Sequence, residues 1–114
     1  MIPAAAVLLS DRAEASLRAL EDSSEPTAKS VVRRARAFRP VLLVDCLHGE
    51  VVRKSAIPGG LQKKYDLENL YVEDLPSFWR LLYTIVRREG RRVIVVVEIV
   101  NHREYSKWFP GRRR

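Results

Sequence analysis

The sequence is poor in cysteine, glycine and proline, and these shortages exclude an internal disulfide and a wholly disordered chain. A single cysteine, Cys46, excludes an internal disulfide and fits a reducing compartment. Five glycines and six prolines, with 46% hydrophobic residues, exclude a wholly disordered chain. The apolar stretches are too short to span a bilayer, and no basic segment precedes the apolar N-terminus as in a signal peptide. We therefore expect a soluble cytoplasmic protein with one domain over residues 1–114.

Negative charge is also in short supply. Lys and Arg number 21 against 14 Asp and Glu, which gives a net charge of +7 and an isoelectric point near 10.1. Such a field attracts polyanions, so nucleic acid is the expected partner, with an anionic membrane surface, an acidic protein or mere solubility as alternatives. Most of the cations are Arg, whose planar guanidinium group matches the geometry of a phosphate. The scarcity of Asn and Gln is typical of a thermophilic source.

Apolar periodicity predicts an α+β fold. The expected elements are a strand at 6–10, helices at 11–21, 26–38 and 41–47, a basic loop at 51–65, strands at 67–75, 78–87 and 92–100, and a helix at 104–109. Pro40 is expected to interrupt the helices. We expect the N-terminal strand and two to three helices to pack on one face of a C-terminal antiparallel three-stranded meander. Residues 110–114 are expected to form a frayed basic tail.

The hairpin from Phe78 to Val100 carries the first functional signal. The run Val93–Val97 in its second strand is β-branched throughout, which predicts a central strand covered on both faces. Arg80 interrupts the apolar run of the first strand, where burying a cation is costly unless an anion answers it. Two explanations remain open: an ion pair with Glu98 on the next strand, or an arginine that faces a phosphate.

A second cluster follows the hairpin. As a histidine, His102 can move a proton in either direction. Arg103 adds a permanent cation, and the hydroxyl of Tyr105 becomes a base only where cations lower its pKa. His48, at the end of a predicted helix, is interpreted as structural. With Arg80, the residues from His102 to Tyr105 form a candidate catalytic set.

These groups suit RNA transesterification. A base removes the proton from a 2′-OH, the oxyanion attacks the adjacent phosphate, and guanidinium groups stabilise the charge that develops. We expect no metal and no small-molecule cofactor, because Cys, His and Asp side chains show no ligand spacing. The sequence also contains no phosphate-binding glycine loop and no serine nucleophile motif.

Three stretches resemble the RelE/ParE superfamily of toxins from type II toxin–antitoxin systems, in an archaeal and bacterial RelE-like branch. The central stretch is similar to the superfamily signature and runs Asn69-Leu70-Tyr71-Val72-x-Asp74-Leu75-Pro76-x-x-Trp79-Arg80-Leu81-Leu82-Tyr83-Thr84. The tail is similar to that of the branch and runs Glu98-Ile99-Val100-Asn101-His102-Arg103-Glu104-Tyr105-Ser106-Lys107-Trp108-Phe109. The connector Leu47-His48-Gly49-Glu50-x-Val52-x-Lys54-x-x-Ile57-Pro58 is also similar, so the resemblance covers residues 41–109.

The resemblance implies a RelE-like fold, ribosome-dependent cleavage of mRNA, and an antitoxin protein that masks the site. It implies that Arg80 stabilises the phosphate and that His102 and Tyr105 transfer protons. It also implies RNA contacts from basic residues, which we assign to Arg53, Lys54, Lys63, Lys64 and Arg103. The spacing from His102 to Tyr105 is shorter than in many members, and no acidic residue matches the general base that some members use.

Two other readings stay open. The ParE side of the superfamily inhibits DNA gyrase without RNA-cleaving residues, so the chain could be a gyrase-inhibiting toxin or a non-catalytic basic binding module. In a purely structural reading, Arg80 pairs with Glu98. The aromatic residues then belong to the core, namely Trp79, Tyr83, Tyr105 and Trp108.

Overall fold

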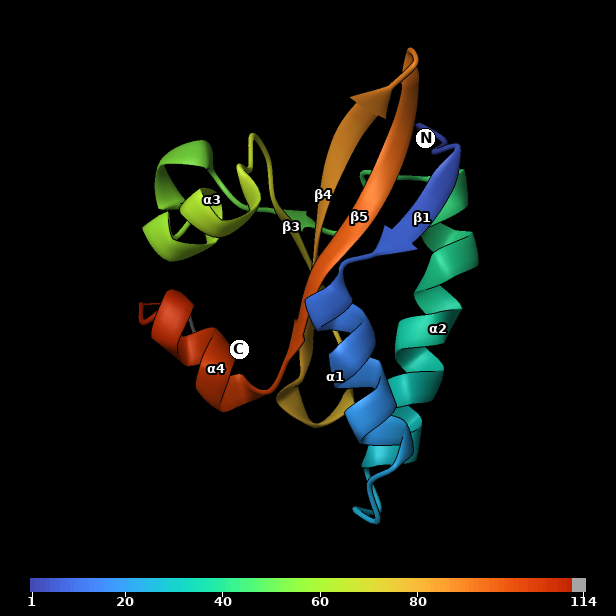
Figure 1. Cartoon of the computed structure of the whole chain (residues 1–114), viewed down its shortest axis with the longest axis vertical. Coiled ribbons are helices and arrows are strands. Elements are labelled where there is room, and N and C mark those ends of the chain that lie inside the picture. The colour runs from blue at the N-terminus through green and yellow to red at the C-terminus, as the bar shows by residue number, and fades with distance from the viewer. Residues whose placement is uncertain (112–114) are drawn as a thin grey trace.

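A five-stranded mixed sheet forms the centre of the fold, with strand order β1-β5-β4-β3-β2 (Figure 1). The computed structural model describes residues 1–111. Its elements are β1 (Ala6–Leu9), α1 (Asp11–Glu21), α2 (Ala28–Val44), β2 (Glu50–Val51), η1 (Lys54–Ala56), α3 (Gly59–Tyr65), β3 (Tyr71–Asp74), η2 (Pro76–Phe78), β4 (Arg80–Arg88), β5 (Arg91–Val100) and α4 (His102–Trp108). The predicted α+β class is confirmed. The end of the expected basic tail, residues 112–114, lies outside the described residues.

The antiparallel meander β3-β4-β5 is present as predicted, but the sheet is larger. The short strand β2, expected as part of a loop, pairs with β3 at one edge. At the other edge β1 pairs in parallel with β5, with Ala6 opposite Val93 and Leu9 opposite Val96. β5 is therefore an interior strand of the sheet, as its apolar, β-branched composition predicts.

Helix α1 begins directly after β1 because Ser10 caps it. The Ser10 Oγ accepts a hydrogen bond from the Ala13 N–H at 3.0 Å and so satisfies one of the free donors of the first turn. The predicted helix over residues 11–21 is confirmed with these bounds. Its buried stripe consists of Ala13, Leu17 and Leu20.

Helix α2 runs through Pro40, and the prediction that this proline ends the helix is wrong. Proline has no N–H, so the carbonyl of Arg36 loses its usual helical partner. Arg36 and Pro40 are both exposed, so water can bond this carbonyl at little cost. Leu42, in the last turn, is only 1% exposed and holds the end of the helix against the core.

The connector over residues 51–65 was expected to be a loop, and this prediction is also wrong. It forms part of β2, the single turn η1 and the seven-residue helix α3. Leu61 and Ile57 are buried and anchor these turns. A helix of two turns shows too few apolar positions for its periodicity to be recognised in the sequence.

Helices cover both faces of the sheet, not one face as expected (Figure 1). Residues of β4 alternate between the faces, so Leu81 packs with α1 and α2 whereas Leu82 packs with α3 and α4. Both faces of the central strands are apolar, so each face is buried under helices that shield it from water. The second cluster is built from Val52, Ile57, Leu61, Leu67, Leu70, Val72, Leu82, Val97, Val100, Tyr105 and Phe109.

A β-bulge in β5 alters which side chains reach this second face. The register skips Val97, which lies between the partners of Leu82 and Tyr83. The Val97 carbonyl accepts a hydrogen bond from the Ser10 hydroxyl at 2.7 Å. Beyond the bulge, Glu98 lies opposite Leu82 and shares its face, next to α3 and α4. Regular alternation would have directed it toward α1 and α2.

Candidate nucleic-acid interface

Arg80 is the first residue of β4, and only 3% of its side chain is exposed. Its Nε lies 3.1 Å from the Asp74 Oδ1 on β3, and its Nη1 donates to the Trp79 carbonyl at 3.1 Å. Its Cζ lies 5.0 Å from the centroid of the Tyr105 ring. Among the described residues, the ion pair of Arg80 is with Asp74 and not with Glu98. Of the two explanations that the sequence left open for Arg80, the ion pair with Glu98 is therefore wrong.

The three candidate catalytic residues lie at the same end of the sheet. Arg80 and Tyr105 are in contact, and the buried Tyr105 ring stacks on Phe109 at a centroid distance of 4.8 Å. His102 is exposed at the start of α4, and its ring centroid lies 5.9 Å from that of Phe78. Phe78 stands two residues before Arg80, so His102 lies beside the turn that leads into β4 and Arg80.

A cavity of about 400 Å³ lies beside this cluster, lined by Asp74, Leu75, Ser77, Phe78 and Arg80. Phe78 is 63% exposed. Sequence reasoning placed Phe78 in a strand and did not single it out as functional. The Pro76-Ser77 pair signalled a turn, but no glycine marked the unusual backbone that follows.

The cations predicted to bind RNA lie on the elements that cover this side of the sheet (Figure 1). All five are exposed: Arg53, Lys54, Lys63, Lys64 and Arg103. Two of them occupy the last turn of α3, and Arg103 lies in the first turn of α4. Only Lys64 among them has an ion pair among the described residues, with Glu98 at 3.3 Å. Most of this positive charge is therefore available to a polyanion.

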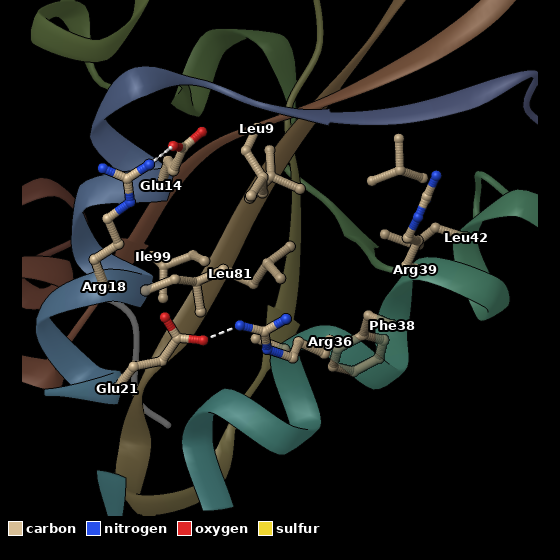
Figure 2. Close-up of a pocket in the computed structure, with 14 residues that line it drawn as sticks. Leu9, Glu14, Arg18, Glu21, Arg36, Phe38, Arg39, Leu42, Leu81 and Ile99 are labelled. Carbon is tan, nitrogen blue, oxygen red and sulfur yellow. Dashed lines mark hydrogen bonds and ion pairs between the residues drawn. The ribbon is translucent and has the colours of Figure 1, made fainter. Parts of the chain in front are cut away.

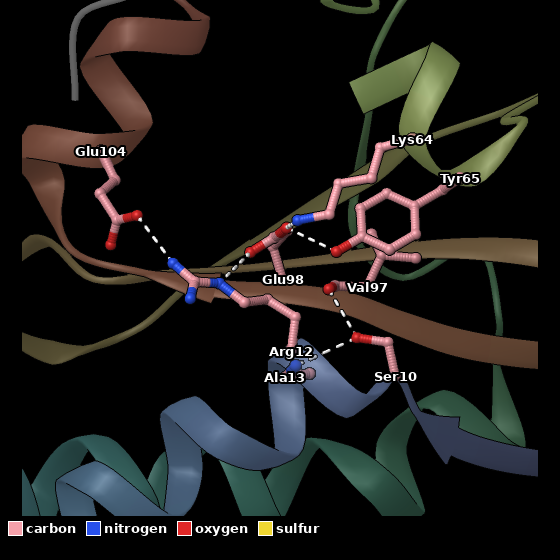
Figure 3. Close-up of polar contacts among 8 residues, drawn as sticks. All are labelled: Ser10, Arg12, Ala13, Lys64, Tyr65, Val97, Glu98 and Glu104. Atoms are coloured by element: carbon pink, nitrogen blue, oxygen red, sulfur yellow. Dashed lines mark hydrogen bonds and ion pairs between the residues drawn. The ribbon is translucent and has the colours of Figure 1, made fainter. Parts of the chain in front are cut away.

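The carboxylate of Glu98 is the buried hub of a polar network (Figure 3). Its Oε2 accepts a hydrogen bond from the Tyr65 hydroxyl at 2.6 Å and lies 3.3 Å from the Lys64 Nζ. Its Oε1 lies 3.5 Å from the Arg12 Nε, and the same guanidinium reaches Glu104 at 3.3 Å. Burial, followed by the hydrogen bond to Glu98, raises the pKa of Tyr65. The network joins α1, α3, β5 and α4.

A larger apolar groove, of about 410 Å³, lies on the opposite face between α1, α2 and the sheet (Figure 2). Its floor includes Leu81, Val96 and Ile99. Charged pairs form its rim: Glu14 with Arg18 at 2.5 Å, and Glu21 with Arg36. None of the candidate catalytic or RNA-binding residues lines this groove.

Two further observations concern reactive groups. Cys46 is buried, and burial raises the pKa of its thiol, so this side chain is typical of a small buried hydrophobe. Within residues 1–111, no three His, Cys, Asp or Glu side chains come together where they could hold a metal ion. None of the helices in this part of the chain has the length and apolar character needed to cross a bilayer.

Comparison with known proteins adds no family assignment. No protein-family model, curated protein or solved structure matches the chain. The resemblance to RelE/ParE toxins therefore rests on the three sequence stretches alone and stays a prediction. The structure shows that Asp74, Leu75 and Arg80 of the central stretch line one cavity and that Tyr105 of the tail contacts Arg80.

Proposed function

We propose that this chain is a toxin of the RelE type that cleaves mRNA at the cavity beside Arg80. The observation that carries the proposal is the position of Arg80, Tyr105 and His102, which β4 and α4 bring to one end of the sheet. A phosphate in the cavity would meet the buried guanidinium. The exposed cations of α3 and α4 and the net charge of +7 favour the approach of RNA.

The reaction proposed is a transesterification. His102 takes the proton from the 2′-OH, and the 2′ oxygen forms a bond to the neighbouring phosphorus. The bond from phosphorus to the 5′ oxygen breaks, and that oxygen takes a proton from water or from the Tyr105 hydroxyl, which the resemblance assigns to proton transfer. Arg80 stabilises the negative charge on the phosphoryl oxygens in the transition state. The products are a 2′,3′-cyclic phosphate and a free 5′-OH.

Tyr105 has two separable roles in this proposal. Its ring packs against the guanidinium of Arg80 and is only 2% exposed, so it positions the cation. The resemblance assigns its hydroxyl to proton transfer. Replacement by Phe keeps the ring and removes the hydroxyl. If Tyr105→Phe retains cleavage, the positioning role suffices; a loss of about 100-fold or more assigns proton transfer to the hydroxyl.

The test is to map cut ends on mRNA translated in the presence of the purified protein. We expect fragments with 5′-OH ends, and we expect Arg80→Gln to reduce their rate of formation by about 100-fold. The matched control is Arg87→Gln, the same change at an exposed position on the same strand. Intact mRNA with the wild-type protein, both on the ribosome and free, would exclude the proposed cleavage.

A second function, binding of nucleic acid without cleavage, is favoured by one specific observation. The guanidinium of Arg80 is almost fully buried and is already paired with Asp74. A binding module of this kind would hold RNA with a strong dependence of affinity on salt. It would yield no 5′-OH ends in the same experiment, so one measurement separates the two functions.

An antitoxin partner belongs to the first proposal. Toxins of the type that the chain resembles are held inactive by a protein encoded beside them. A short frame directly upstream of the gene is the candidate. We expect growth arrest when the chain is expressed alone and normal growth when that frame is expressed with it. Arrest that persists on co-expression would remove the neighbour as a partner.

A further inference from the structure

The turn before β4 holds an aromatic ring out in solvent. Phe78 is 63% exposed, although burial of such a side chain is normally favourable. Ser77 and Phe78 both have positive φ, at 59° and 63°, and neither is glycine. Bulky residues rarely adopt this backbone conformation, because it is strained. Such strain is characteristic of functional sites.

The surroundings of Phe78 are those of a ligand site. Its ring lies 5.9 Å from the ring of His102, with an angle of 60° between the planes. It lines the same cavity as Arg80, together with Asp74. An aromatic ring and a guanidinium therefore border one opening, and the imidazole of His102 lies beside the aromatic ring.

We propose that Phe78, with His102 beside it, is a stacking platform for one nucleobase of a bound single-stranded RNA. This inference rests on the proposed function and adds the residue that holds a base while Arg80 meets a neighbouring phosphate. Every base has a π face, so an aromatic platform beside a cation recognises single-stranded nucleic acid without demanding a sequence. The net charge of +7 favours RNA over an apolar protein segment as the occupant of this surface.

The experiment measures the dissociation constant of a short fluorescent single-stranded RNA by anisotropy. We expect Phe78→Ala to weaken binding by about tenfold and Phe78→Trp to preserve it. The control is Val44→Ala, which removes another exposed apolar side chain, 57% exposed, at the end of α2. Because Phe78 carries no charge, the slope of log affinity against log salt should be unchanged in Phe78→Ala.

A second arm uses the wild-type protein and RNAs in which one nucleotide at a time lacks its base. One abasic position should weaken wild-type binding by about as much as Phe78→Ala does, and it should have no further effect on that variant. Equal affinity of wild type and Phe78→Ala would overturn the platform, and a protein partner would then be the reason for the exposed ring. If the wild-type protein fails to bind any RNA, the proposed function falls together with the platform.

Discussion

The guanidinium carbon of Arg80 lies 5.0 Å from the centroid of the Tyr105 ring, and this contact joins the first residue of β4 to the middle of α4. A buried cation over an aromatic face contributes about 2 kcal/mol. The same guanidinium is bound from the other strand by Asp74, 58% of whose side chain is exposed. Under the proposed function, an RNA phosphate would compete with Asp74 for this guanidinium.

Replacing Asp74 by Asn should tighten RNA binding. The exposed carboxylate competes with a phosphate for Arg80, and its removal should raise affinity by about fivefold, or ~1 kcal/mol. The control is Glu25→Gln, which removes one negative charge from the exposed loop between α1 and α2. Measurement of both dissociation constants at one salt concentration decides the matter. An equal increase in RNA affinity in Asp74→Asn and Glu25→Gln would mean that net charge alone determines the effect.

Replacing Glu98 by Gln should destabilise the fold. Its carboxylate is 1% exposed and is approached by Arg12, Lys64 and the Tyr65 hydroxyl. Hydrogen bonds to a charged group stabilise more than neutral ones, so we expect a loss of about 2 kcal/mol in the free energy of unfolding. The measurement is urea denaturation. Glu104→Gln, at a carboxylate 39% exposed, should cost less than about 0.5 kcal/mol; comparable losses would contradict the buried network.

Glu73 should make stability depend on pH. Burial raises the pKa of Glu73 above its ordinary value of 4.5, although the hydrogen bond to His48, at 2.7 Å, opposes the shift. A raised folded pKa means that the folded chain holds this proton more tightly, so the contribution of Glu73 is full below the unfolded pKa and is lost as pH rises through the folded value. Compared with wild type, Glu73→Gln should therefore gain stability as pH rises.

The measurement for Glu73 is the free energy of unfolding in urea between about pH 4 and 7. The difference between Glu73→Gln and wild type should grow with pH and then level off. Glu68→Gln, at an exposed position, serves as the control. A difference that shrinks with rising pH would show that the pair with His48 outweighs burial.

Replacing Glu89 by Asn should stabilise the hairpin. Arg88 pairs with Arg91, so the loop consists of Glu89 and Gly90, with φ values of 52° and 77°. Two positive φ values are those of a type I′ turn, for which Asn-Gly is the preferred pair. We expect a gain of about 0.5–1 kcal/mol in thermal unfolding and no change in RNA affinity. Gly90→Ala should do the reverse, and stabilisation by both changes would contradict the turn assignment.

Much of the fold could be predicted from local patterns. Ser10 before the stripe of Ala13, Leu17 and Leu20 marked the start of α1, and the β-branched run Val93–Val97 marked an interior strand. The errors arose where tertiary contacts override local preference. Buried Leu42 carries α2 past its proline. The short helix α3 depends on the apolar cluster below it.

The candidate site was predictable in part. A cation in an apolar strand marked Arg80, because burial of an unanswered charge is costly. The ion pair with Glu98, one of the two explanations left open, does not form, because the β-bulge at Val97 and the placement of α1 and α3 surround Glu98 with other donors. Phe78 could not be predicted, since its exposure follows from backbone angles that the sequence Pro76-Ser77-Phe78 does not signal.

The parallel pairing of β1 with β5 has a consequence for folding during synthesis on the ribosome. Residues 6–9 leave the ribosome well before their partners at 93–96 have been made. Pairing across such a separation requires closure of a long loop and is slow. Arg80 and Tyr105 also come together only after α4 has emerged. Under the proposed function, a nascent chain therefore cannot cleave RNA before Tyr105 has left the ribosome.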